Sequence, residues 1–219
     1  MLQVHSFTFN PFQENTFVLS DSQGNCAIID PGCSHVGEEM QLKQYVETQG
    51  LNVVLLLNTH GHIDHMLGNA FVKQTYQVPF ETGEGVVAEL DQAILHGELV
   101  GIKPTPSPKP DRLLQAGDTV SFGEIVMEVL FTPGHSAGHI SFLHRESKSL
   151  FSGDVLFRGG IGRFDLPGGN YETLMETISE TLIPLGDDIT VYCGHGPTTQ
   201  LGWERESNGY LLQYLASRP

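Results

Sequence analysis

Asn58-Thr59-His60-Gly61-His62-Ile63-Asp64-His65 is the stretch of this 219-residue sequence that decides the fold. It follows Val53 to Leu57, a wholly apolar run that is typical of a strand buried on both faces. Within six residues stand four side chains of metal-binding type: His60, His62, Asp64 and His65. Histidine and carboxylate donors without cysteine suit zinc, iron or manganese and exclude a closed thiolate site. The stretch therefore predicts a metal site in the loop after a buried strand.

Three further donors follow strands that the pattern predicts later in the chain. His135 comes after the predicted strand 125–131, Asp154 after 149–152 and His195 after 189–193. Each donor stands beside a glycine, which allows close approach of the backbone, and a rigid strand can aim each side chain. With the first cluster they make seven candidate metal ligands: His60, His62, Asp64, His65, His135, Asp154 and His195.

Seven donors are more than one catalytic metal with an open position needs, so the set predicts two divalent metal ions that share a bridge. Zinc is the expected metal, with iron and manganese as alternatives. The first metal takes three histidines: His60, His62 and His135. The second metal takes a carboxylate and two histidines: Asp64, His65 and His195. Asp154 has two carboxylate oxygens and is the predicted bridge. A water shared by the two ions would have its pKa brought from about 15.7 toward about 7, which yields hydroxide.

The order His-x-His-x-Asp-His, followed by His135, Asp154 and His195 at strand ends, resembles the metallo-β-lactamase superfamily over essentially the whole chain. The resemblance implies an α/β fold in one domain over residues 1–219. Its expected architecture is a four-layer αβ/βα sandwich with the site at one edge between two sheets. Asp154 as bridge, and the string Gly162-Arg163-Phe164-Asp165-Leu166-Pro167-Gly168-Gly169, are similar to short bacterial hydrolases of the glyoxalase II or hydroxyacylglutathione hydrolase type.

The chemistry of the donors favours a thioester as substrate. Beyond the seven ligands no separate general acid stands out, so the preferred leaving group is one that departs without a proton. A thiolate, whose parent thiol has a pKa of about 8.5, meets this condition. We expect a small-molecule thioester attacked by the metal-bridging hydroxide, with Asp64 as the catalytic residue that accepts the proton. After His195 the sequence has 24 residues, enough for one helix, so we expect no counterpart here of the helical region that binds glutathione in full-length glyoxalase II enzymes.

Other functions use a similar set of ligands. A mononuclear iron persulfide dioxygenase resembles the same scaffold and would use a 2-His-1-carboxylate triad, here His60, His135 and Asp154. A lactonase acting on acyl-homoserine lactones would use the same hydroxide attack. A metal-stabilised binding module is the alternative without catalysis.

Composition limits the partners. The chain has 26 Asp and Glu against 11 Lys and Arg, a formal charge of −15, and ten histidines. No basic stripe is present, so we expect no nucleic-acid partner and no membrane partner. Three cysteines without CxxC spacing argue against a disulfide framework and a structural zinc knuckle. No apolar run is long enough to cross a membrane, and the N-terminus lacks the features of a signal peptide, so the expected location is cytoplasmic.

Periodicity predicts the remaining elements. Strands are expected within the first thirty residues and at 119–122 and 140–143, and helices at 35–49, from near His65, and at 84–98, 171–183 and 201–217. Alternating prolines at 104–110 predict an extended surface segment. Arg163 and Asp165 are predicted to form an ion pair within their loop. His139 is predicted to be structural, with a hydrogen bond that supports a metal ligand as the alternative.

Overall fold

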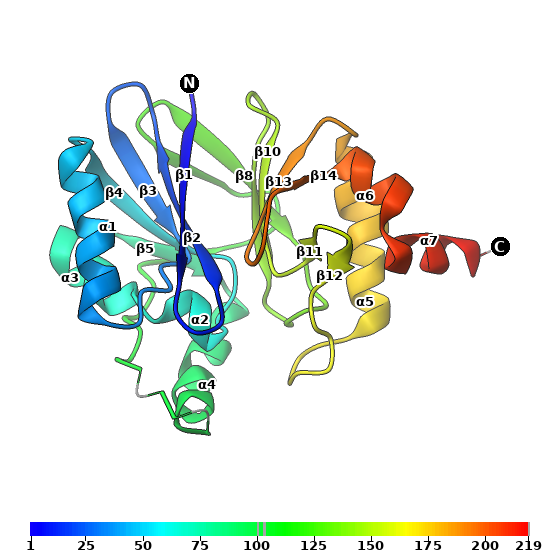
Figure 1. Cartoon of the computed structure of the whole chain (residues 1–219), viewed down its shortest axis with the longest axis horizontal. Coiled ribbons are helices and arrows are strands. Elements are labelled where there is room, and N and C mark those ends of the chain that lie inside the picture. Colours follow the sequence, from blue (N-terminus) through cyan, green and yellow to red (C-terminus); the bar gives the residue numbers. More distant parts are fainter. Residues whose placement is uncertain (100, 103, 219) are drawn as a thin grey trace.

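Two six-stranded sheets face one another at the centre of the molecule (Figure 1). The computed structural model describes residues 1–99, 101–102 and 104–218, without the side chains of residues 94–96, 98 and 99. The first sheet has the order β1 (Gln3–Phe9), β2 (Glu14–Ser20), β3 (Asn25–Ile29), β4 (Asn52–Asn58), β5 (Phe80–Gly83) and β6 (Arg112–Leu114). The second sheet has the order β14 (Thr199–Gln200), β13 (Thr190–Cys193), β10 (Ser149–Gly153), β9 (Ile140–His144), β8 (Ile125–Phe131) and β7 (Thr119–Phe122).

Helices cover the outer face of each sheet (Figure 1). On the side of the first sheet lie α1 (Val36–Thr48), α2 (Ile63–Met66), α3 (Asn69–Tyr76) and α4 (Val86–Leu99). On the side of the second sheet lie α5 (Tyr171–Glu176), α6 (Leu201–Ser207) and α7 (Gly209–Ala216), with a small hairpin of β11 (Leu156–Phe157) and β12 (Gly160–Ile161).

Three hydrophobic cores fill the spaces between these layers. In β4, Val53 and Leu56 pack in the core beneath the first helices, whereas Leu55 and Leu57 pack between the sheets. The third core lies between the second sheet and its helices, where Leu150 packs with residues of α5. The apolar run Val53 to Leu57 of β4 thus packs on both faces of the first sheet, and the four-layer αβ/βα sandwich is confirmed.

Most of the predicted elements are confirmed, and α4 begins two residues after the predicted start. The predicted helix 201–217 is wrong as a single helix, because Asn208 leaves helical geometry and its side chain caps α7 by accepting from the N–H groups of Tyr210 and Leu211. The predicted helix 171–183 widens into a π-helix over Thr177–Leu182 and ends in a 3-10 turn, where Pro184 has no N–H to donate.

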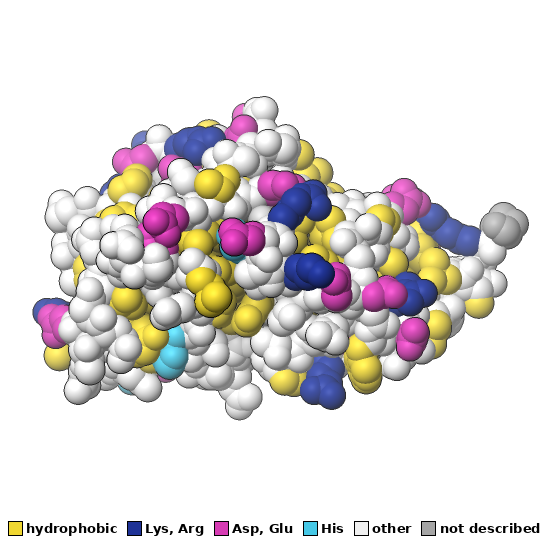
Figure 2. Space-filling view, turned by 90° about the horizontal axis from the view of Figure 1, so that it is seen from above, with side chains coloured by type: hydrophobic (Ala, Val, Ile, Leu, Met, Phe, Trp, Pro, Cys, Tyr) yellow, Lys and Arg dark blue, Asp and Glu magenta, His cyan; other side chains and the backbone are white. Residues whose placement is uncertain are grey.

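Six short elements were not predicted: α3, β5, β6, β11, β12 and β14. Five of them are strands of two to four residues, too short to show periodicity. Residues 104–110 contain no helix or strand, as predicted, and the three cysteines are buried without disulfides. In the described part of the chain no helix has the length and apolarity needed to cross a membrane. Acidic and basic side chains are mixed on the face shown in Figure 2.

Substitution of Phe142 tests the core between the two sheets. Its side chain in β9 is 0% exposed and belongs to that core, whereas Phe131 in the neighbouring β8 is 49% exposed. Phe142→Ala is expected to lower the free energy of unfolding by about 3–5 kcal/mol, because it leaves a cavity. Phe131→Ala is expected to lower it by less than about 1 kcal/mol. Urea denaturation of the metal-free proteins measures both values, and equal losses would contradict this placement of Phe142.

Candidate metal centre

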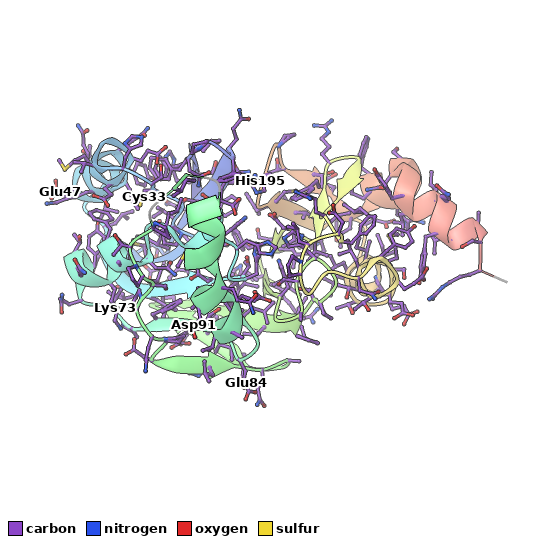
Figure 3. All side chains as sticks on the ribbon, turned by 90° about the horizontal axis from the view of Figure 1, so that it is seen from below. Cys33, Glu47, Lys73, Glu84, Asp91 and His195 are labelled. Atoms are coloured by element: carbon purple, nitrogen blue, oxygen red, sulfur yellow. The ribbon has the colours of Figure 1, made fainter. Side chains whose placement is uncertain are left out.

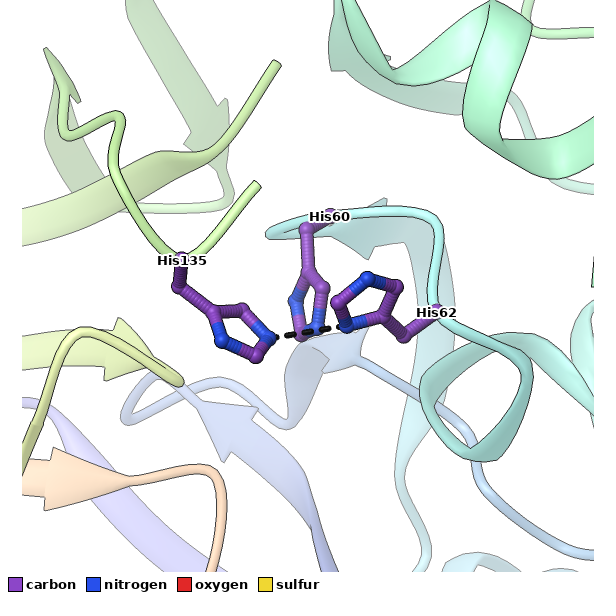
Figure 4. Close-up of side chains that lie close together, drawn as sticks. All are labelled: His60, His62 and His135. Carbon is purple, nitrogen blue, oxygen red and sulfur yellow. Dashed lines mark hydrogen bonds between the residues drawn. The ribbon is translucent and has the colours of Figure 1, made fainter. Parts of the chain in front are cut away.

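The structure brings all seven predicted ligands together at one edge of the two sheets. Five of them lie in the loops that follow β4, β8, β10 and β13, and Asp64 and His65 lie in the short helix α2 beyond β4, so strands from both sheets direct side chains to the same place. In the first group, one ligand atom from each of His60, His62 and His135 lies within 4.8 Å of the others (Figure 4). In the second group the same holds for Asp64, His65 and His195. These are the two groups that the sequence assigned to separate metals.

Asp154 lies between the groups. Its Oδ2 is 3.6 Å from His135 Nε2 in the first group and 3.4 Å from His195 Nε2 in the second. Its Oδ1 is 3.3 Å from His65 Nε2, an approach that lacks hydrogen-bond geometry. A carboxylate that contacts both groups is in the right place to bridge them.

The donor set fits divalent metal ions. His60 Nε2 and Asp154 Oδ1 are buried and have no hydrogen-bond partner, which is costly for polar atoms. His135 Nε2 and His62 Nδ1 face one another at 2.8 Å. Inward-facing nitrogen and carboxylate lone pairs of this kind are satisfied by a cation such as zinc, iron or manganese.

Hydrogen bonds on the outer side of three imidazoles assign their tautomers. His195 Nδ1 donates to the carbonyl oxygen of Phe12 at 3.1 Å, and His135 Nδ1 donates to that of Arg163 at 2.7 Å. His65 Nδ1 donates to Asp30 Oδ2 at 3.1 Å. Carbonyl and carboxylate oxygens accept, so each Nδ1 carries a proton, and each imidazole in its neutral form has its Nε2 lone pair available to a metal.

Asp30 is a functional residue that sequence reasoning missed. It directly follows β3, which pairs with β4, and it accepts from the N–H and the hydroxyl of Thr59 at 2.7 and 2.6 Å. It groups geometrically with His60 and His65, but it accepts from the protonated Nδ1 of His65 and therefore orients this predicted ligand from the side opposite to Nε2. The signal in the sequence was an aspartate at the end of an apolar strand, in the segment Asp30-Pro31-Gly32.

His139 supports Asp154. Its Nε2 accepts from the backbone N–H of Asp154 at 3.2 Å, and its Nδ1 lies 2.9 Å from the hydroxyl of Thr132. Its ring also stacks on His60, with the ring centroids 4.8 Å apart. These contacts favour the alternative role, support of a metal ligand, over a purely structural one.

The two groups differ in the pKa values of their histidines. Burial lowers the pKa of His65, but the carboxylates of Asp154 and Asp64 outweigh it and hold this pKa well above its usual value. Burial likewise opposes protonation of His195, yet hydrogen bonds to the same carboxylates raise its pKa to about 10. In the first group burial, reinforced by His135, lowers the pKa of His62 to about 3. At neutral pH the metal-free second group therefore binds protons, whereas His62 is neutral.

A cavity of about 450 Å³ opens over the centre. Besides ligands, its lining contains four apolar side chains: Phe12, Ile63, Phe157 and Leu166. Arg163 also lines it and forms a two-point ion pair with Asp165, with both N···O distances 2.9 Å, so the predicted pair is confirmed. The side chains that surround the predicted ligands in this cavity are thus mostly apolar.

The difference in protonation predicts how metal binding depends on pH. A histidine must lose its proton to bind a metal, so His65 and His195 of the second group are expected to release protons, whereas His60 and His62 of the first group, whose pKa values burial lowers, are not. Between about pH 6 and pH 8 the affinity for one of two zinc ions should therefore rise more steeply than the other affinity. Calorimetric titration in buffers of different ionisation enthalpy counts the protons. Two affinities with the same pH dependence would contradict this assignment.

Comparisons with known proteins agree with the fold. The model of the Metallo-beta-lactamase superfamily matches residues 9–195. Hydroxyacylglutathione hydrolase GloC of Haemophilus influenzae is 40% identical over 205 residues, which cover 91% of this chain and 93% of that protein.

Two solved structures are also similar along nearly their whole length. The BLEG-1 B3 metallo-beta-lactamase superposes with a TM-score of 0.87 at 33% identity, covering 96% of this chain and 99% of the other. TTHA1623 in a di-iron-bound form has a TM-score of 0.85 at 35% identity, covering 95% of this chain and 100% of the other. The donor cluster and these matches identify a metallo-hydrolase, and this chain belongs to the metallo-β-lactamase superfamily.

Proposed function

We propose that this chain is a dinuclear metal-dependent hydrolase of a small thioester, similar to glyoxalase II. The observation that carries the proposal is the position of Asp154, whose carboxylate lies within 3.6 Å of histidines of both groups. A single metal would leave one of the two groups unused. The relative named hydroxyacylglutathione hydrolase supports the thioester as the substrate class.

The seven ligands form two sets, each of which would hold one metal ion. His60, His62 and His135 hold the first, and Asp64, His65 and His195 hold the second, with Asp154 shared. Two divalent ions, when bound, supply hydroxide at neutral pH and polarise the substrate carbonyl. Asp64 Oδ2 lies 3.2 Å from His195 Nε2, and the charge of His65, opposing burial, lowers the pKa of Asp64. This ionised carboxylate accepts the proton of the attacking water.

The lining of the cavity favours a thiolate as leaving group. Of the described residues that line it, those that are not ligands are apolar, apart from Arg163, which Asp165 already pairs. A guanidinium does not give up its proton near neutral pH. An amine leaving group would need a proton donor here, whereas a thiolate departs without one. The apolar walls also exclude water from the reacting carbonyl.

Metal content and substrate preference together test the proposal. Zinc-loaded protein is expected to contain two metals per chain and to hydrolyse S-lactoylglutathione or a simpler acyl thioester, detected by trapping the released thiol. The β-lactam nitrocefin and an acyl-homoserine lactone serve as competing substrates. A protein that holds one iron and consumes oxygen with a persulfide would contradict the proposal, as would faster turnover of nitrocefin or lactone than of any thioester.

Asp64→Asn tests the second group directly. The amide is a poorer ligand and a poor base, so the variant is expected to retain one metal and to lose about 10²–10⁴-fold in thioester kcat. Asp188→Asn is the matched control, because Asp188 pairs with Lys148 at the surface. Metal analysis and steady-state kinetics check both variants. Near-normal turnover of Asp64→Asn with one metal would show that a single metal suffices.

A further inference from the structure

The β1–β2 turn, residues 10–13, lies against the second group of donors. It belongs to the first sheet, whereas the loop that carries His195 follows β13 of the second sheet. His195 Nδ1 donates to the carbonyl oxygens of Phe12 and Gln13 at 3.1 and 3.2 Å, and Glu14 forms an isolated β-bridge with His195. Figure 3 labels His195 beside the ribbon of this first hairpin. The turn therefore joins the two sheets at a predicted metal ligand.

Asn15, the second residue of β2, fixes the loop of His195. It is 7% exposed, and its Oδ1 accepts from the hydroxyl of Thr8 at 3.1 Å, which orients the amide so that its N–H groups face the loop. Its backbone and side-chain N–H groups donate to three carbonyl oxygens around His195: those of Cys193 (3.0 Å), Gly194 (2.7 Å) and Gly196 (2.8 Å). Because these contacts bracket His195, they fix where its Nε2 points.

Asn10 fixes a second ligand from the other end of the turn. Its Nδ2 donates to the carbonyl oxygens of Asp64 and Gly32, each at 3.0 Å, and its Oδ1 accepts from the N–H of Phe12. Its φ of +52° lies in the left-handed region, which asparagine adopts more readily than most residues. One side chain thus forms the turn and holds the backbone of Asp64.

The first group is held by a different residue. Glu89 of α4 accepts from the N–H of Gly61 at 2.9 Å and from the N–H of Gly138 at 3.0 Å. These two glycines lie in the loops of His60 and His135. Asn10 and Asn15 therefore contact the second group and Glu89 contacts the first, so these contacts can be removed from one group at a time by mutation.

We propose that Asn10 and Asn15 are positioning residues that set the metal affinity of the second group and not that of the first. The proposal rests on the proposed function, because it takes the second group as a metal site. The partners that orient metal ligands typically change metal affinity by about 10–100-fold when they are removed. Loss of either amide frees the backbone of Asp64 or of the His195 loop, so the same scale applies here.

Cobalt titration of the metal-free full chain, with absorbance and a competing chelator, gives two dissociation constants. Asn15→Ala is expected to weaken one of them about 10–100-fold and to leave the other within about threefold. Asn10→Gly, in which glycine still permits the left-handed backbone, should weaken the same constant. Glu89→Ala should weaken the other constant. Asn52→Ala, which removes an exposed side-chain hydrogen bond to Asn25, should change neither.

The two dissociation constants of these variants decide whether the proposal holds. Unchanged constants in both asparagine variants, or equal weakening of both constants, would overturn it and leave the dinuclear site intact. Wild-type protein that binds only one cobalt would overturn the proposed function together with this proposal. If Asn15→Ala does not fold, the result for Asn10→Gly alone decides, because this residue is only partly buried.

Discussion

The carboxylate of Asp154 must carry a negative charge among buried residues, and the site is arranged around this requirement. Removing such a charge from water costs on the order of several kcal/mol unless positive charge lies close. Histidines of both groups lie within 3.6 Å of it, and in the loaded protein metal ions would take over this role. The backbone approaches this carboxylate closely at Gly194, where a Cβ would overlap Asp154 Oδ1.

The fold meets this requirement by ending strands of two sheets at one edge. Three apolar cores fix the strands, while the loops beyond them are held by polar contacts of Asp30, Glu89 and Asn15. The hydrophobic effect therefore sets where the ligands are, and hydrogen bonds set where they point. This division explains why charged and amide side chains are buried at this edge.

The pattern of the sequence predicted the candidate ligands, and the resemblance to the metallo-β-lactamase superfamily predicted the layers, but neither predicted the contacts of Asp30, Asn15 and Glu89. The donor cluster from His60 to His65 is local, and β4 shows its burial in its composition, so both could be found from pattern alone. Asn15 binds the backbone of Cys193, 178 residues away, and Glu89 binds that of Gly138, 49 residues away. Such a hydrogen bond leaves no periodic pattern in the sequence. Because the partner is a backbone group, the bond also requires no particular residue type at the partner position. The break at Asn208 was missed because an asparagine inside an apolar helical pattern also fits an exposed helix position.

Anomalous diffraction from crystals of the zinc-loaded protein at the zinc edge tests the central claim most directly. We predict two peaks, one bounded by His60, His62 and His135 and the other by Asp64, His65 and His195, with the Asp154 carboxylate beside both. A single peak bounded by His60, His135 and Asp154, at full occupancy and with excess zinc present, would contradict the dinuclear centre.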